Sequence, residues 1–140
     1  MTRTLAAPRP AVWRAMTDPE EIASWWGPRG FSVPSVDYEP AVRATYKIAM
    51  QPPEGELFHL HGQFREVEPP ARLTYTFNWE PPDPDDRETL VELVLEERGD
   101  ATEVSLTQGE FATGDRLELH DGGWTDSFDR LAEYLRSPSP

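Results

Sequence analysis

The first part of the chain has apolar residues at helical spacing. Asp18 followed by Pro19 is typical of an N-cap with proline at the first helical position, and two acidic residues follow in the first turn. The pattern predicts two short helices, over about 10–16 and 18–25, the second ending at Gly27 and Pro28. The apolar residues recur every three to four positions, at Val12, Trp13, Met16, Ile22, Trp25 and Trp26.

From Phe31 onward apolar positions alternate with polar ones, which is typical of strands with one buried face. Alternation recurs over residues 45–50, 58–64, 73–79, 91–96 and 103–107. Gly99 and Asp100 predict a tight hairpin between the last two strands. We therefore expect an antiparallel run of five to six strands, with a further short strand near Arg3–Leu5.

The last segment returns to helical spacing. Gly122 and Gly123 stand just before its apolar stripe, and each glycine costs a helix about 1 kcal/mol relative to alanine. Either the helix begins here with Asp121 as its cap, or it is continuous from about Asp115 and its glycines leave room over a cavity. The order of elements predicts an α+β fold with helices on one face of a curved sheet. The stripe is formed by Trp124, Phe128, Leu131 and Leu135.

Length and charge narrow the class of protein. A chain of 140 residues predicts a single domain, taken as residues 1–136, with 137–140 as a frayed C-terminal tail. There are 26 acidic against 13 basic residues, a formal net charge of −13. This charge argues against nucleic acid as a partner, because phosphate binding needs a basic surface. It also argues against docking on an anionic membrane.

The absence of cysteine excludes a disulfide framework, a thiolate nucleophile and a cysteine-based metal site. Neither a signal-peptide pattern nor an apolar stretch of about 20 residues is present. We therefore expect a soluble cytoplasmic protein. No nucleophile elbow, phosphate-binding loop or dinucleotide fingerprint occurs, so no catalytic residue and no cofactor are predicted.

Polar candidates have simple structural interpretations. His59 and His61 share one strand face and could supply two metal ligands, but the alternation turns both outward, so a solvated pair is favoured and no metal site is predicted. Glu66 and Glu68 could supply a general acid or base. A solvated strand face, or pairing with Arg65 or Arg72, is the favoured interpretation.

Aromatic residues make up 11% of the chain. Tyr75, Phe77 and Trp79 on one strand face are expected to meet the terminal helix, either as packed core or as the wall of a cavity. Periodicity alone favours the core. Trp25 and Trp26 are adjacent, so they point about 100° apart in a helix. One is expected to pack inward, and the other is left open as a half-exposed side chain or a cavity entrance.

Several runs together resemble one known family. The opening is similar to that of activator of heat-shock protein 90 ATPase homologue-like proteins, in Ala7-Pro8, Val12-Trp13, 17–20 and 25–28. Residues 62–67 with 69–73 resemble that family's "G-x-[YF]-x-E-V-x-P-P-x-R-L" strand pair, and Gly123-Trp124 its terminal helix. This chain departs from the family pattern at one place, where Arg43 and Ala44 stand at the positions of two glycines. We therefore expect the backbone bend that glycines would allow to be less available there.

The resemblance implies the SRPBCC superfamily, with the START and birch-pollen-allergen-like helix-grip fold. In that fold a curved antiparallel sheet of about six to seven strands wraps a long C-terminal helix, and two short helices follow the first strand. A cavity for an apolar ligand lies between sheet and helix. The residues expected to line it are Trp26, Phe31, Tyr46, Phe64, Tyr75, Phe77, Trp79, Leu93, Trp124 and Phe128.

The function implied by this resemblance is binding of a small hydrophobic or aromatic ligand, without established catalysis. Two alternatives stay open: an interaction module that activates a chaperone ATPase, and an enzyme of the polyketide cyclase or aromatase type. The enzyme would need a polar residue with a shifted pKa among the cavity aromatics, and none is obvious in the sequence. Open edge strands of such sheets also suggest a homodimer.

Overall fold

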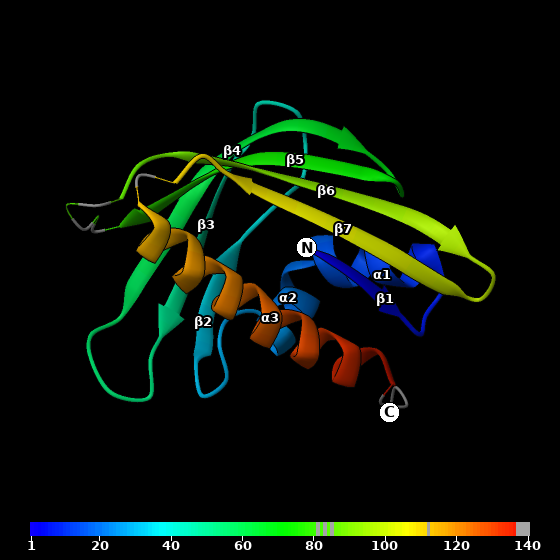
Figure 1. The fold of residues 1–140 in the computed structure, drawn as a ribbon, viewed down its shortest axis with the longest axis horizontal. Helices are drawn as coiled ribbons and strands as arrows, with labels where there is room; N and C mark the ends of the chain where they lie inside the picture. The colour runs from blue at the N-terminus through cyan, green and yellow to red at the C-terminus, as the bar shows by residue number, and fades with distance from the viewer. Residues whose placement is uncertain (81, 83, 85, 112, 137–140) are drawn as a thin grey trace.

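Seven strands form a single antiparallel sheet in the order β1-β7-β6-β5-β4-β3-β2 (Figure 1). The computed structural model describes residues 1–80, 82, 84, 86–111 and 113–136, so the tail expected at 137–140 lies outside the described residues. Gly99 and Asp100 join the last two strands as predicted. The strands are β1 (Thr2–Leu5), β2 (Ser32–Asp37), β3 (Thr45–Gln51), β4 (Phe58–Glu68), β5 (Arg72–Glu80), β6 (Thr89–Arg98) and β7 (Ala101–Gly109).

The two predicted short helices are present as α1 (Arg9–Thr17) and α2 (Pro19–Trp25). The Asp18 carboxylate caps α2, because its Oδ1 accepts hydrogen bonds from the backbone N–H groups of Glu20 at 2.9 Å and Glu21 at 3.4 Å. The Trp25 indole Nε1 donates to the Ala15 carbonyl over 2.8 Å and so joins α2 to α1. Capping and this buried bond fix the angle between two helices that are too short to be stable alone.

The terminal helix α3 (Gly114–Arg136) is continuous. Gly122 and Gly123 therefore lie inside it, and the alternative of a helix that begins at Asp121 is wrong. Figure 1 shows α3 crossing one face of the curved sheet, with α1 and α2 near its C-terminal half. α2 contacts both β2 and α3, while α1 contacts β6 and β7. This arrangement confirms the α+β helix-grip fold.

The bend expected to be less available at Arg43 and Ala44 is present. Arg43 has a φ of 74°, in the left-handed region that glycine favours. Its backbone N–H donates to the Phe64 carbonyl at 2.9 Å, and its own carbonyl accepts from Gln63 Nε2 at 3.1 Å. The expectation from the sequence is therefore wrong. These two hydrogen bonds to the backbone of Arg43 hold an arginine in a conformation that glycine usually adopts.

Gly62 in β4 is required by close packing rather than by its φ angle. A Cβ atom at this position would lie 1.9 Å from the carbonyl oxygen of Thr76 in β5. The same oxygen accepts a 2.7 Å hydrogen bond from the Tyr46 hydroxyl, which reaches over Gly62 from β3. The glycine of the strand-pair motif therefore makes room for a bond that crosses the middle of the sheet.

The sheet ends at β1 on one side and at β2 on the other. The homodimer expected from such edges stays a prediction. In the described part of the chain, no helix combines the length and the apolar character needed to cross a membrane.

Candidate functional site: an aromatic pocket beneath the terminal helix

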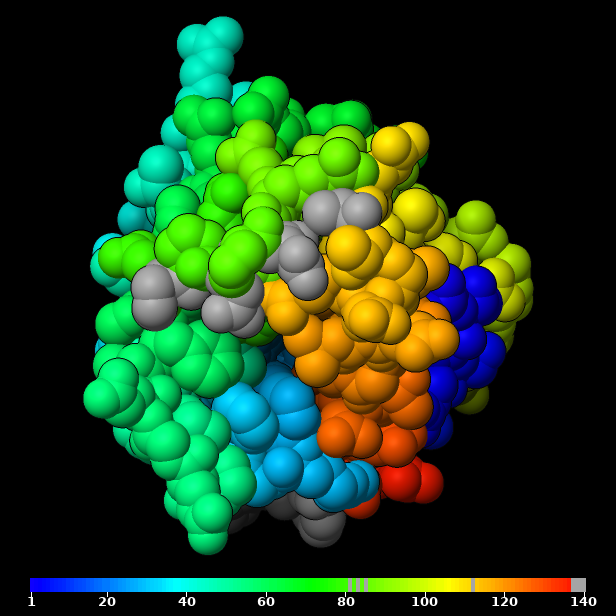
Figure 2. All heavy atoms as spheres, turned by 60° about the vertical axis from the view of Figure 1, so that its left-hand side comes forward, coloured from blue at the N-terminus to red at the C-terminus, as the bar shows by residue number. Residues whose placement is uncertain are grey.

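A pocket of about 810 Å³ lies between the first half of α3, the segment that follows α2, and strands β3 to β5. Figure 2 shows the hollow between the β3–β4 hairpin and the orange start of α3. Aliphatic side chains line it at Met50, Leu57, Leu60 and Leu119. Its aromatic wall consists of Trp26, Phe31, Phe58, Phe77, Trp79 and Trp124.

The aromatic rings form two groups. On the helix side Trp26 and Trp124 meet edge to face, with centroids 5.3 Å apart and planes at 78°. On the sheet side Phe58 contacts Trp79 at 5.4 Å, and Trp79 contacts Phe77 at 5.0 Å. Edge-to-face contacts of this kind add to the gain from burial and hold the rings in place. The pocket is thus bounded by two walls of ordered rings.

Hydrogen bonds at the indole nitrogens orient two of the tryptophans. Trp124 Nε1 donates to Gln108 Oε1 at 2.7 Å, and Gln108 Nε2 donates to the Thr89 hydroxyl at 2.8 Å. Trp79 Nε1 donates to His120 Nε2 at 3.1 Å. With the polar edges occupied by protein, each indole is fixed as an apolar wall.

The turn after α2 is held against α3 by Arg130. Its guanidinium donates to the carbonyl oxygens of Trp26 at 2.8 Å and Gly27 at 3.1 Å. The Gly27 N–H in turn donates to the Ser127 hydroxyl at 3.1 Å, and Gly27 has a φ of 92° that favours glycine. These bonds place the Trp26 ring in the pocket wall.

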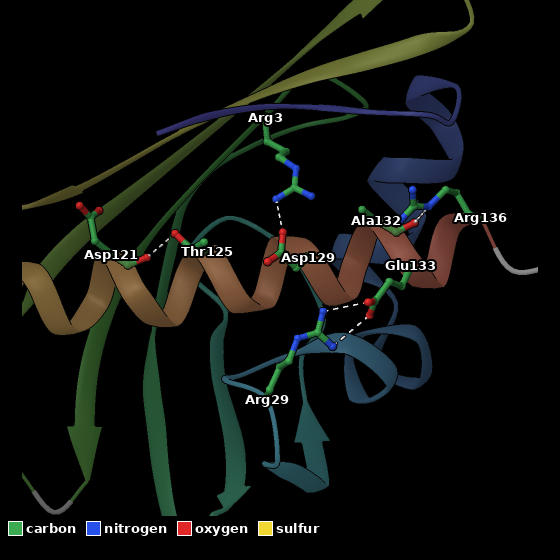
Figure 3. A network of polar contacts seen from close by, with 8 residues as sticks. All are labelled: Arg3, Arg29, Asp121, Thr125, Asp129, Ala132, Glu133 and Arg136. Carbon is green, nitrogen blue, oxygen red and sulfur yellow. Dashed lines mark hydrogen bonds and ion pairs between the residues drawn. The ribbon is translucent and has the colours of Figure 1, made fainter.

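Ion pairs anchor the outer side of α3 (Figure 3). The Arg29 guanidinium binds both carboxylate oxygens of Glu133, at 2.8 and 3.1 Å. Arg3 of β1 contacts Asp129 at 2.5 Å. Since these groups are partly exposed, they set the position of α3 more than they stabilise it.

His120 is the buried titratable group of the pocket. Burial lowers its pKa to about 4, and the positive charge of Arg116 acts in the same direction, while Asp86 opposes both. The imidazole is therefore neutral near pH 7. Because Nε2 accepts from Trp79, the ring proton resides on Nδ1. The His120 ring also lies 4.6 Å from that of Phe111.

The charged groups of the pocket are mostly acidic. Asp86 and Arg116 form an ion pair, with side chains only 7% and 16% exposed. Glu56 and Glu118 are exposed, and Asp126 is half-buried. Among the described lining residues, four carboxylates therefore accompany a single guanidinium that is already paired.

The ten residues expected to line a cavity fall into two groups. The structure brings five of them around the pocket: Trp26, Phe31, Phe77, Trp79 and Trp124. The other five are buried in the core outside the pocket lining: Tyr46, Phe64, Tyr75, Leu93 and Phe128.

Three of these core residues, Tyr46, Phe64 and Tyr75, pack together with Tyr38 at one end of the concave face of the sheet. The Tyr38 ring lies 5.0 Å from that of Phe64, and the Tyr46 ring lies 5.3 Å from that of Tyr75. Burial raises the pKa of Tyr75. This end of the concave face is packed with protein side chains, so the hollow lies towards the other end, around Phe77 and Trp79.

Sequence reasoning missed His120, Phe58 and Met50 as pocket residues. His120 lies four positions before Trp124, so the helical stripe extended by one turn would have included it. Phe58 and Met50 continue the inward faces of their strands. Of the two alternatives left open for the second of the adjacent tryptophans, half-exposure is wrong, because Trp25 and Trp26 are 0% and 5% exposed, and Trp26 lines the pocket.

The remaining polar candidates lie away from the pocket. His61 Nε2 is 3.7 Å from a Glu80 carboxylate oxygen, and both side chains are exposed. Glu66 pairs with Arg72 Nε at 3.0 Å. Over the described ranges, no group of three or more histidine, aspartate or glutamate side chains gathers as a metal ion would require.

A curved sheet gripping a long helix, with an aromatic pocket between them, defines the helix-grip class of proteins. The family model of Activator of Hsp90 ATPase homolog 1-like protein matches residues 6–136, and the chain belongs to this family. No curated protein matches the sequence.

Solved structures show the same fold. A protein from Chromobacterium violaceum has a TM-score of 0.89 at 24% identity, over 99% of this chain and 96% of that one. The AHSA1 protein from Silicibacter pomeroyi has a TM-score of 0.84 at 28% identity, over 96% and 94%. A protein from Mesorhizobium loti gives 0.76 at 26% identity, over 99% and 97%. This agreement confirms the fold along nearly the whole chain.

Proposed function

We propose that this protein binds a small hydrophobic or aromatic molecule in the pocket beneath α3. The observation that carries the proposal is the 810 Å³ hollow with an aromatic wall on two sides. Protein interiors are otherwise close-packed, so a hollow of this size with apolar walls is space that a ligand can occupy. It falls within the range of ligand sites, which combine apolar walls with few polar groups.

The same geometry favours binding over catalysis. His120 is neutral, and its Nε2 lone pair is occupied by the Trp79 indole N–H. The Asp86 carboxylate is paired with Arg116. Neither of these two groups among the pocket aromatics is thus free to act as the general base that a cyclase or aromatase reaction would require, and the lining carboxylates Glu56 and Glu118 are exposed to solvent.

The test uses N-phenyl-1-naphthylamine, a neutral aromatic probe whose emission rises in apolar surroundings. We expect saturable binding of one probe per chain. Gly123→Met places a flexible side chain in the pocket and is expected to weaken binding at least about tenfold, because it fills the space the probe needs. Gly123→Ala is the matched control, since its Cβ would meet only Pro28 at an ordinary 4.0 Å.

Indole N–H signals in NMR spectra provide a second readout that needs no variant. Trp26, Trp79 and Trp124 line the pocket, whereas Trp13 and Trp25 do not. Probe binding in the pocket should shift the signals of the first three and leave the other two in place. Absence of saturable binding, or equal shifts at all five indoles, would overturn the proposal.

The family description favours a second function, stimulation of a chaperone ATPase. We expect either activity to operate in the cytoplasm, with which a cysteine-free chain is compatible. Purified protein should be titrated into a bacterial Hsp90 during steady-state ATP hydrolysis. A rise in rate that survives Gly123→Met would assign the activity to a surface other than the pocket, and an unchanged rate would reject this second function.

A further inference from the structure

The mouth of the pocket has a repeated pair of residue types. On the loop between β3 and β4, Glu56 precedes Leu57, and on α3, Glu118 precedes Leu119. Both leucines are unusually exposed for their type, at 42% and 56%. Each side of the opening thus offers an apolar contact next to a carboxylate, and Figure 2 shows the hollow between these two segments.

The charge at this mouth disfavours one large class of apolar ligands, those that carry a carboxylate. A fatty acid or aromatic carboxylate would need a cation at the opening. Among the described lining residues the guanidinium of Arg116 is the sole cation, and it is paired with Asp86 and 16% exposed. An anionic head would instead lie beside Glu56 and Glu118, which is unfavourable in a partly desolvated mouth.

A cationic group is favoured by the same arrangement. Within the described part of the chain, neither Glu56 nor Glu118 forms an ion pair with another residue. Indole faces attract cations through their negative π-electron density, and three tryptophans stand in the walls. The net charge of −13 further raises the local concentration of cations around the protein.

From the proposed function and these charges, we infer that the pocket selects aromatic ligands that carry a positively charged amine. The ring system lies among Trp26, Trp79 and Trp124, and the ammonium group lies at the mouth near Glu56 and Glu118. The aromatic wall provides the binding energy, while the two carboxylates decide which charge is accepted.

Three naphthalene compounds with one ring system test this inference by calorimetry. They are 2-naphthylmethyl-trimethylammonium, 2-naphthylmethanol and 2-naphthylacetate. We expect the ammonium compound to bind at least about tenfold more tightly than the carboxylate, with the alcohol between them. The ratio of the affinity for the ammonium compound to that for the carboxylate should fall when salt is raised from about 20 mM to about 200 mM, because exposed charges are screened.

Two double variants distinguish the effect of the carboxylates at the mouth from the effect of the protein's overall negative charge. Glu56→Gln with Glu118→Gln should reduce the ammonium-to-carboxylate ratio at least about threefold and leave binding of the alcohol unchanged. Glu54→Gln with Asp115→Asn is the matched control, since it removes the same charge from the same two segments at residues outside the pocket lining.

Each outcome decides between the two proposals. Equal affinities, tighter binding of the carboxylate, or an equal effect of the control pair would overturn the charge selection while leaving the pocket as a binding site. Failure of all three compounds to bind or to displace N-phenyl-1-naphthylamine would overturn this inference alone if that probe still binds, and the proposed function as well if it does not.

Discussion

The indole of Trp79 donates a hydrogen bond to the imidazole of His120 across the boundary between β5 and α3. The bond requires a neutral imidazole with an unprotonated Nε2. It therefore couples the position of the helix over the sheet to the protonation of one residue in the pocket wall.

Acid should destabilise the protein through His120. Its pKa is about 4 in the folded state against 6.5 for an ordinary histidine, so the unfolded chain binds a proton first as pH falls. The stability that the neutral ring provides is present above about pH 6.5 and is lost progressively down to about pH 4. Urea unfolding at several pH values measures this loss.

The variant His120→Gln isolates that effect from the titration of carboxylates. Glutamine keeps a hydrogen-bond acceptor for Trp79 but does not titrate in this range. The difference in unfolding free energy between wild type and variant should shrink or reverse from pH 6.5 to 4. A constant difference over this range would contradict the assignment, as would a nitrogen NMR signal showing a protonated Nε2 at pH 7.

Gly62→Ala should destabilise the fold by at least about 3 kcal/mol, because the new Cβ cannot coexist with the Thr76 carbonyl 1.9 Å away. Both atoms belong to paired strands, so relief requires the sheet to separate locally. Chemical denaturation provides the measurement. Gly122→Ala is the matched control: its Cβ meets open space, and helix propensity predicts a gain of about 1 kcal/mol. Two variants of equal stability would refute the packing argument.

Arg43→Gly should be more stable than Arg43→Ala by about 0.5–1 kcal/mol. Both variants lose the same exposed side chain, but only glycine adopts a φ of 74° without steric cost. The advantage is partly offset by the greater freedom of glycine in the unfolded chain. Thermal unfolding of the pair measures the difference, and an alanine variant equal to or above the glycine variant would show that the bend is relaxed in solution.

Arg130→Met should cost about 1–3 kcal/mol, since the carbonyl oxygens of Trp26 and Gly27 lose a charged donor. The loss should also weaken probe binding, because Trp26 is no longer held in the pocket wall. Arg136→Met serves as the comparison, as the exposed Arg136 side chain donates to the Ala132 carbonyl on its own helix and not to the turn after α2. Similar losses in the two variants would mean that the turn after α2 is positioned by other contacts.

Much of the fold follows from local patterns. The stripe of Trp124 and Phe128 predicts a helix and its inner face, and the alternation of Tyr75, Phe77 and Trp79 predicts a strand with one buried side. Asp18 and Pro19 locate the start of α2 to the residue, because capping depends on neighbours in the chain. These signals act over a few residues and can be recognised before any tertiary contact is known.

The candidate site depends on contacts between distant residues. Tyr75 and Phe77 share one face of β5, yet Phe77 lines the pocket and Tyr75 packs in the core with Tyr46. The alternation of side chains along a strand predicts which face of the sheet a residue lies on. It does not predict whether that part of the face borders a pocket or is covered by packed side chains. The pKa of His120 is lowered by burial and by the charge of Arg116. Its Nε2 accepts from Trp79, which lies 41 positions away in sequence.

By itself, then, the sequence determined the order of strands and helices along the chain, the resemblance to the family and the acidic character of the surface. Only the tertiary structure decided which aromatic side chains surround a space and which fill one. The reason is physical: a hollow is the volume that side chains of α3, β4 and β5 leave between them, and no single segment encodes it. The placement of Glu56 and Glu118 on the lining of one pocket was likewise decided by folding.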